Sequence, residues 1–191
     1  MKLYILMSTF MTAIIFSNTL LAAKNANEET GEFLMEYKFM VAKDSDGKLI
    51  HPHLALSCAI DFNDIVDARR NKQTIGRSHL TPLLAGGVDP WLDQVVSSIN
   101  EKFPIKASKK ITIKAELIRL YTYFQGSNIN GIAAVKFNYY QDETLIGSKN
   151  IRGFSSRSDL FASTEGHNTT VNTAMSDAIY QLLTDVHKIC E

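Results

Sequence analysis

The sequence predicts an α+β domain in which two amphipathic helices pack on one face of an antiparallel sheet that contains a three-stranded meander. Three observations support this fold class. Apolar and polar residues alternate over residues 111–124, 133–139 and 144–154, as in strands with one buried face. Turn-forming residues separate these segments, so the strands are expected to pair as consecutive neighbours. Two further segments, 91–103 and 171–189, repeat apolar residues at helical spacing.

The amino-terminal 23 residues have the three-part form of a secretory signal peptide. Lys2 precedes a long apolar run that ends at the small pair Ala22-Ala23, where cleavage is expected. An uncleaved anchor helix is the alternative interpretation, although polar residues dilute the run. Residues 24–32 are polar and are expected to form a disordered leader, which leaves 33–191 as a single α+β domain.

Composition narrows the compartment and the partners. After cleavage the chain carries 19 basic and 20 acidic residues, a balance that argues against nucleic acid or an anionic lipid surface as the main partner. No cysteine follows directly after the cleavage region, so no lipid anchor is indicated, and no later stretch is apolar enough to span a membrane. We therefore expect a soluble exported protein, periplasmic or secreted, without a transmembrane segment after signal cleavage.

The chain has two cysteines, Cys58 and Cys190, and exported proteins occupy compartments where thiols oxidise. Cys58 is in phase with the apolar face of the alternating run 54–62, and Cys190 continues the apolar stripe of the last helical segment. If that helix packs on that strand, the two sulfurs meet. The pair is predicted to form a disulfide that contributes about 4 to 5 kcal/mol to stability. Two buried free thiols are the alternative.

The first strand of the domain is expected at residues 33–42, before a turn at residues 44–47. Its partner is either residues 49–56 or the strand at 54–62, and the pattern of the residues does not separate these two pairings. Pro52 favours a sheet edge or a break at that point.

Residues 63–88 are predicted to form the longest irregular segment, because glycine, proline and asparagine interrupt it repeatedly. Arg69, Arg70, Lys72 and Arg77 form a local basic cluster within it. Long loops in compact domains are often functional. A solvated connector at the end of the sheet explains the segment equally well.

Capping residues predict where the two helices begin. Asp89-Pro90 predicts the start of the first helix, because aspartate accepts a bond from an exposed amide and proline suits the first helical position. Asn168-Thr169-Thr170 are good capping residues and predict the start of the terminal helix. Both helices then present a wide apolar stripe to the sheet.

Phase and turn residues predict the details of the meander. In its first strand the apolar phase slips between Leu117 and Ile118, which predicts a β-bulge. Residues 126–128 and the pair Asn130-Gly131 are expected to turn the chain into the second strand. Residues 141–143 are expected to turn it into the third.

The sequence contains no coherent constellation for catalysis or for metal binding. His51 and His53 have the spacing of a chelating pair, but further ligands are missing nearby. Cys58 lies among apolar residues without neighbouring cations, which disfavours a nucleophilic role. We therefore predict no catalytic residue, no metal site and no cofactor, and a protein that is not an enzyme. A hydrolase that uses His79 or His167 with a serine and an acid is the catalytic alternative.

The run Asp67-Ala68-Arg69 followed by Ile75-Gly76, then the helix at 91–103, the long strand at 111–124, a meander and a terminal helix, resembles the YajG-like envelope lipoproteins of Gram-negative bacteria. The similarity covers residues 54–191. It implies an α+β periplasmic domain that is usually tethered to the outer membrane and has no established catalytic activity. The chain departs from the family pattern because no lipid-accepting cysteine follows the signal, which suggests a soluble periplasmic relative.

Together these patterns predict a non-enzymatic periplasmic accessory or interaction protein of the cell envelope. It is expected to present a sheet edge or the segment 63–88 to an envelope protein partner. The candidate interaction loop consists of Asp67, Arg69, Arg70, Lys72 and Arg77. A periplasmic carrier of a small molecule or lipid, with an apolar pocket between the helices and the sheet, is the alternative function.

Overall fold

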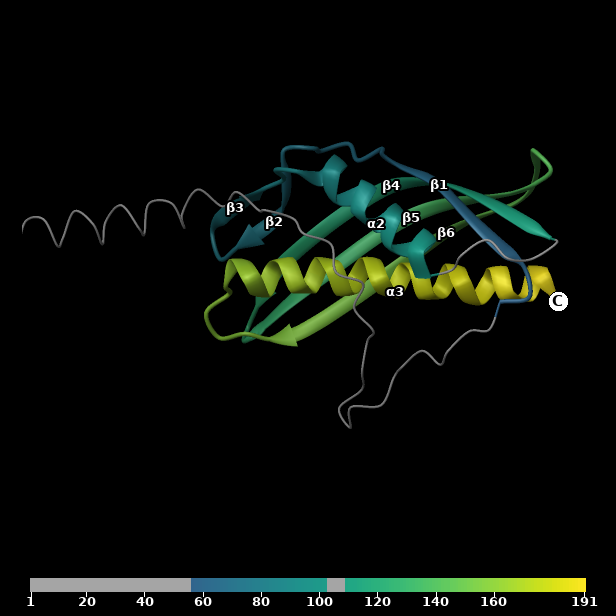
Figure 1. Cartoon of the computed structure of the whole chain (residues 1–191). Coiled ribbons are helices and arrows are strands. Elements are labelled where there is room, and N and C mark those ends of the chain that lie inside the picture. Colours follow the sequence, from purple (N-terminus) through teal and green to yellow (C-terminus); the bar gives the residue numbers. More distant parts are fainter. Residues whose placement is uncertain (1–55, 103–108) are drawn as a thin grey trace, which may run out of the picture. The chain divides into compact units, whose positions relative to one another are not determined.

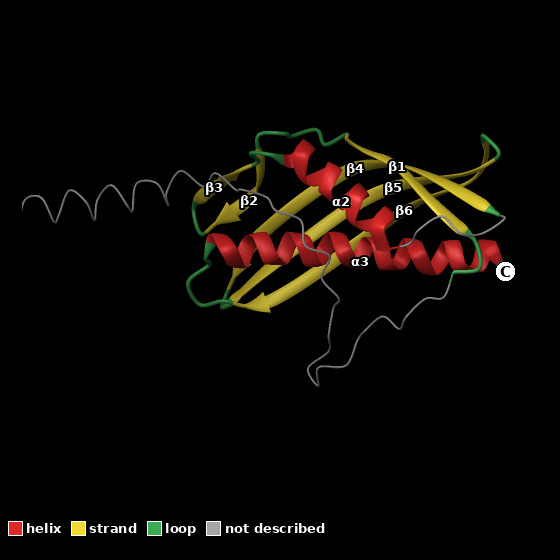
Figure 2. Cartoon of the chain, in the orientation of Figure 1, coloured by secondary structure: helices red, strands yellow, loops and turns green. Residues whose placement is uncertain are grey.

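Six strands form one mixed sheet, and both helices lie on the same face of it (Figures 1 and 2). The structure, a computed structural model, describes residues 56–102 and 109–191, which all fall within one compact unit. The strands are β1 (Ala59–Asp67), β2 (Thr74–Ser78), β3 (Thr81–Leu84), β4 (Lys110–Gln125), β5 (Asn128–Gln141) and β6 (Thr144–Ser158), and the helices are α2 (Val88–Lys102) and α3 (Thr164–Cys190). The signal, the leader, the strand predicted at 33–42 and both His51 and His53 lie outside the described residues.

The sheet has the strand order β3-β2-β4-β5-β6, and β1 also pairs with β4. Strands β4, β5 and β6 follow one another as antiparallel neighbours, as predicted. The prediction of an antiparallel sheet is wrong for the other half of the molecule, because both β1 and β2 run parallel to β4. Pairing between strands so distant in the sequence leaves no local turn signal, and the prediction had no means of detecting it.

The irregular segment predicted at 63–88 is a second correction, since the chain there forms the end of β1 and all of β2 and β3. The strand expected at 54–62 begins at Ala59 and continues to Asp67. A shift of register between Phe62 and Asp64 explains the error. The bulge changes which residues face the core, so Ile65 is buried although the simple alternation ends before it.

The bulge predicted in β4 is confirmed, because the pairing of β4 with β5 skips one residue between Leu117 and Arg119. The turn predicted at Asn130-Gly131 is wrong, since β5 begins at Asn128 and runs through both residues. The chain reverses at Gly126-Ser127, within the turn that was also predicted at 126–128, and Gly126 has a φ of 67° there. The turn before β6 is confirmed, and Asp142 and Glu143 both have positive φ there, as tight hairpin turns require.

Helix α2 begins at Val88, one residue before the predicted start, and carries Asp89 in its first turn. Its apolar stripe is fully buried at Trp91, Val95 and Ile99. The indole Nε1 of Trp91 donates a hydrogen bond of 2.8 Å to Oδ1 of Asn172 in α3. Because the bond is buried, it fixes how the two helices lie on the sheet.

Helix α3 begins one turn earlier than predicted. Ser163 is its N-cap, and the Ser163 hydroxyl accepts a hydrogen bond of 3.0 Å from the amide of Gly166. Asn168-Thr169-Thr170 therefore lie inside the helix rather than before it. The polar stretch 164–170 gave no apolar periodicity by which the sequence could place the first turn. Among the described residues, no helix combines the length and the apolar character that crossing a bilayer requires.

Two glycines let the backbone of α3 lie directly on the sheet. A Cβ atom at Gly153 of β6 would lie 1.8 Å from the carbonyl oxygen of Ala174 and 2.6 Å from the amide nitrogen of Ala178. A Cβ atom at Gly131 of β5 would lie 2.7 Å from the carbonyl oxygen of Thr170. Only a residue without a side chain fits at these two positions. The backbone of α3 therefore lies closer to the strands than it would if side chains packed between them.

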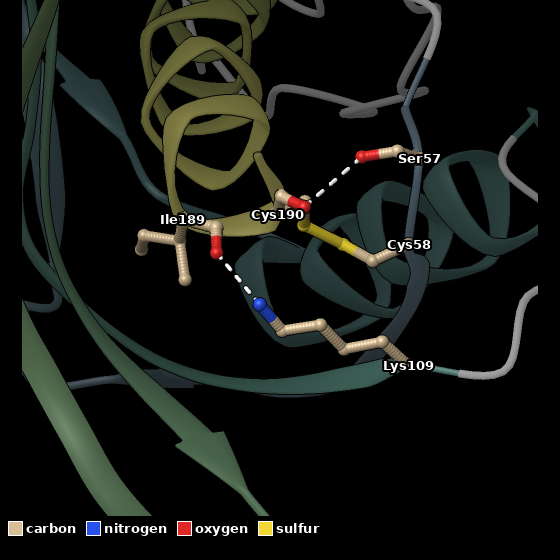
Figure 3. Close-up of a disulfide and its surroundings, with 5 residues drawn as sticks. All are labelled: Ser57, Cys58, Lys109, Ile189 and Cys190. Carbon is tan, nitrogen blue, oxygen red and sulfur yellow. Dashed lines mark hydrogen bonds between the residues drawn. A yellow bond between two sulfur atoms is a disulfide. The ribbon is translucent and has the colours of Figure 1, made fainter.

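The predicted disulfide is formed between Cys58, just before β1, and Cys190, the last residue of α3 (Figure 3). The two Cα atoms are 5.7 Å apart. Around the bridge, the Lys109 ammonium donates a hydrogen bond of 2.8 Å to the carbonyl oxygen of Ile189. A cation at that place also interacts favourably with the negative end of the helix dipole. The carboxyl end of α3 is therefore held to the start of β1 and of β4.

We expect oxidised protein to show no free thiol after unfolding, and reduction to lower its melting temperature by roughly 10 °C. The bridge closes a loop across 132 residues, so the chain-entropy model gives about 5 kcal/mol of stabilisation. Thiol titration in denaturant and calorimetry with and without reductant measure both quantities. Two titratable thiols in protein isolated from an oxidising compartment would contradict the link.

Gly153→Ala is expected to destabilise the protein by roughly 3 kcal/mol, because the new methyl group overlaps the backbone of α3. Gly147→Ala in the same strand is the matched control, since the nearest atom to its Cβ is 3.2 Å away on the Tyr139 ring, a side chain able to shift. Urea unfolding of both variants measures the difference. Equal losses in the two variants would show that α3 does not depend on this close contact.

Candidate functional site

The sheet is interrupted on one side of β4. Strand β1 pairs with β4 as far as Asp67 opposite Leu117, and β2 begins its pairing at Gly76 opposite Thr122. Both strands run parallel to β4, so they form one strand position in which residues 68–73 leave the sheet and return. In the described part of the chain, residues 118–121 of β4 consequently have no strand partner on that side.

A groove of about 470 Å³ lies at this interruption, between the excursion and the bulged part of β4. The bulge matters because it turns Ile118 outward, with 45% of its surface exposed, and leaves Tyr121 38% exposed. The residues that line the groove are Ala68, Arg69, Arg70, Asn71, Thr74, Ile118, Arg119, Leu120 and Tyr121. Three arginines therefore face a partly apolar wall.

Asp67 and Arg69 form a buried ion pair at the base of the excursion. Arg69 donates from Nε to Oδ1 and from Nη2 to Oδ2 of Asp67, both at 2.9 Å, and its amide donates to Oδ1 at 3.1 Å. Burial on its own would raise the pKa of Asp67, but the hydrogen bonds and the charge of Arg69, with a contribution from Lys72, lower that pKa below its usual value. The carboxylate is therefore charged and holds the guanidinium in one orientation.

The ion pair leaves part of the Arg69 guanidinium unused. The side chain of Arg69 is only 3% exposed, and its Nη1 atom has no hydrogen-bond partner in the described structure. A buried charged donor without a partner is unfavourable, and such groups are rare in folded proteins. Because Arg69 lines the groove, an acceptor bound there could satisfy Nη1.

The excursion itself is held in shape by Asn71. Its Oδ1 accepts hydrogen bonds from the amides of Gln73 at 3.0 Å and Thr74 at 3.4 Å. Its Nδ2 donates to the hydroxyl of Thr74 at 3.0 Å. Arg70 precedes this local turn, and both Arg70 and Arg119 of β4 are exposed and line the groove.

The predicted interaction residues divide into three groups. Asp67 and Arg69 are buried and only Arg69 of the two lines the groove, whereas the sequence had suggested an exposed loop. Arg70 and Lys72 are exposed on the excursion, and only Arg70 lines the groove. Arg77 is exposed on β2 and does not line the groove. Whether these residues contact a partner stays a prediction.

The sequence prediction missed Arg119 and the apolar wall beside it. Arg119 lies on β4 directly after the bulge, so it belongs to the predicted strand and was not considered with the loop. The signal was nevertheless present. The phase slip that predicted the bulge also predicts that the residues at the slip leave the regular face of the strand.

The two histidines considered for a hydrolase lie in different environments. His167 is fully buried in α3, and a hydrogen bond of 2.8 Å joins its Nδ1 atom to the Oγ1 atom of Thr122. The pKa of His167 is lowered to about 4, mainly by burial; the charge of Asp159 partly opposes this shift, and the nearby His79 adds to it. His79 is exposed and its ring contacts the ring of Phe124. Within residues 56–102 and 109–191, no three histidine, cysteine or acidic side chains gather as metal ligands do.

The fold and the groove together define an α+β domain with an arginine-lined interruption in its sheet. No protein-family model matches the chain, and no curated protein matches it. Among solved structures, it is similar to a Xanthomonas campestris protein described with the family model DUF330, at 14% identity and a TM-score of 0.45, over 70% of this chain and 88% of that one. It is also similar to a candidate lipoprotein from Caulobacter crescentus, at 7% identity and a TM-score of 0.37, over 50% of this chain and 80% of that one. Neither likeness assigns a family, and the resemblance to YajG-like lipoproteins stays a prediction.

The buried His167 makes stability depend on pH in a defined window. The unfolded chain takes up a proton near the ordinary histidine pKa of 6.5, whereas folded His167 resists protonation until about pH 4. Stability from this residue is therefore complete above pH 6.5 and is lost as the pH falls through that window, by about 3 kcal/mol in total. Urea unfolding at several pH values measures the slope.

His167→Gln is expected to remove most of this slope, even though the variant is less stable at neutral pH. His187→Gln, at the other end of α3, is the control and should keep the slope because His167 is intact. A slope that persists unchanged in His167→Gln would show that another group is responsible.

Proposed function

We propose that the chain is a non-enzymatic interaction protein of the bacterial cell envelope, exported by its signal peptide, which engages a protein partner at the arginine-lined groove. The observation that carries the proposal is that three arginines line the groove. Arg69 is buried and held in one orientation, whereas Arg70 and Arg119 are exposed. Arginines are enriched where proteins bind one another, particularly beside apolar side chains such as Ile118 and Tyr121.

The edges of the sheet are less suited to a partner than the groove. On β6, the side chain of Asp177 accepts a hydrogen bond from the amide of Phe154, and that of Gln181 donates to the carbonyl of Arg152. On β1, the amide group of Asn100 bonds both the N–H and the carbonyl of Phe62. These side chains occupy positions that an added strand would need.

The opposite border of the sheet is β3, a strand of four residues that contains Pro82. A short strand with proline is a common device against pairing with another chain. Of the two surfaces that the sequence suggested, a sheet edge or the segment 63–88, the structure therefore favours the segment.

The alternative functions receive less support. A catalytic use of His167 requires access to solvent, which its burial against Thr122 prevents. A carrier requires an apolar cavity between the helices and the sheet. In the described residues that space is filled by large side chains with less than 2% exposure, among them Trp91, Phe62, Phe137 and Met175.

The proposal is tested by placing a photo-cross-linking amino acid at Tyr121, in the groove, in the protein expressed in its own host. We expect an adduct of defined mass with a partner of the envelope. The double variant Arg70→Glu/Arg119→Glu should reduce that adduct at least about fivefold, because opposite charge at the rim repels the same partner.

Two controls make the experiment specific. The same cross-linker at Leu145, an exposed position on β6, should give no such adduct. The variant Arg157→Glu changes an exposed arginine of β6 that does not line the groove and should keep the Tyr121 adduct. Adducts of equal yield at Tyr121 and Leu145, or none at either position, would contradict the proposal.

A further inference from the structure

We infer that the groove recognises a carboxylate carried on a short extended peptide segment, with Nη1 of Arg69 as the donor that reads it. The inference rests on the proposed function, since it names the chemistry of the partner at the same groove. A side-chain carboxylate of aspartate or glutamate and the carboxylate at a chain end present the same group, and the experiment below separates them.

The geometry of Arg69 carries the first step. A guanidinium has five N–H groups in a fixed planar arrangement. Asp67 engages one edge of the plane through Nε and Nη2, and Nη1 lies on the part that Asp67 does not reach. With the plane held by two bonds of 2.9 Å, the position of Nη1 is set before any ligand arrives. Folding has already fixed the conformation of this arginine, so a ligand does not lose affinity through the side-chain entropy of ordering it.

The charge around the groove carries the second step. Asp67 balances Arg69, so the charge that a ligand meets comes from Arg70 and Arg119 at the lining and from Lys72 close by on the excursion. No acidic residue is among the lining residues. An incoming carboxylate therefore finds one buried donor and two exposed cations, a combination that favours an anion over a neutral or cationic group.

The interrupted pairing of β4 carries the third step and distinguishes a peptide from a small anion. Residues 118–121 lie between the last pair with β1 and the first pair with β2, so the described structure offers them no strand partner on that side. An extended segment can bond such backbone groups, which a phosphate or a lipid headgroup cannot do in register. Ile118 and Tyr121 supply apolar surface for the side chains that flank the carboxylate.

The experiment uses the oxidised mature protein and isothermal titration with synthetic peptides. The probe is a seven-residue peptide of alternating valine and glutamate with both ends blocked. The comparison peptides replace every glutamate with glutamine, either with both ends blocked or with a free terminal carboxylate. We expect the glutamate peptide to bind at least about tenfold more tightly than the blocked glutamine peptide, and its affinity to fall with salt.

Three variants connect the binding to the named atoms. Arg119→Gln, at an exposed position of β4, should weaken binding of the glutamate peptide about fivefold. Arg69→Lys keeps the charge but loses the planar donor and should weaken it about tenfold. Arg157→Gln on β6 is the control and should leave the affinity unchanged. If Arg69→Lys does not fold, Arg119→Gln still decides the outcome.

Each result decides the inference. Tight binding of the free-ended glutamine peptide assigns the groove to a chain terminus, and preference for the blocked glutamate peptide assigns it to acidic side chains; both support carboxylate recognition. Equal binding of the blocked glutamate, blocked glutamine and free-ended glutamine peptides, unchanged affinity of the tightest-binding peptide in Arg119→Gln, or stronger binding of inorganic phosphate or phosphatidylglycerol vesicles overturns it. A partner cross-linked at Tyr121 without peptide binding would leave the proposed function standing and remove only the carboxylate.

Discussion

The seating of α3 on two glycines is the constraint on which the rest of the structure depends. At Gly131 and Gly153 the helix backbone meets the strands without an intervening side chain, so its height above β5 and β6 is fixed along its length. The disulfide then holds its carboxyl end to the start of β1, and the bond between His167 and Thr122 holds its amino end to β4. A helix attached at both ends and in its middle leaves little freedom for the sheet beneath it. The position of α2 follows through the bond between Trp91 and Asn172.

The groove exists because one strand position is divided between two segments. Strand β1 leaves β4 after Leu117, and β2 returns beside it at Thr122, with the β4 bulge between these two points. Had the pairing continued, Ile118 and Arg119 would lie against a neighbouring strand. Instead, Arg69 of the excursion forms a buried ion pair with Asp67 at the end of β1. The divided strand position therefore explains why the groove exists, and the bonds to Asp67 explain why Arg69 has a fixed orientation there.

Local patterns predicted the parts of the fold that depend on neighbouring residues. The phase slip at Ile118 predicted the bulge, Asp89-Pro90 predicted the first helix within one residue, and the phases of Cys58 and Cys190 predicted the bridge. Parallel pairing of Gly76 with Thr122 depends on residues far apart and was not predictable from either segment alone. At the groove, Asp67 and Arg69 were predicted as members of a candidate interaction loop. Their burial was missed because charged residues are expected at the surface unless they pair with each other.

Side chains that bond the edge strands affect how readily copies of the protein associate at high concentration. Asn100, Asp177 and Gln181 bond edge groups of β1 and β6, and Pro82 limits β3. These bonded groups are not free to pair edge to edge with another copy of the chain, which disfavours fibrils and open-ended polymers. The remaining opening on β4 is only four residues long and is enclosed by the excursion. If the groove binds an extended segment as we propose, this length limits it to one segment for each folded chain.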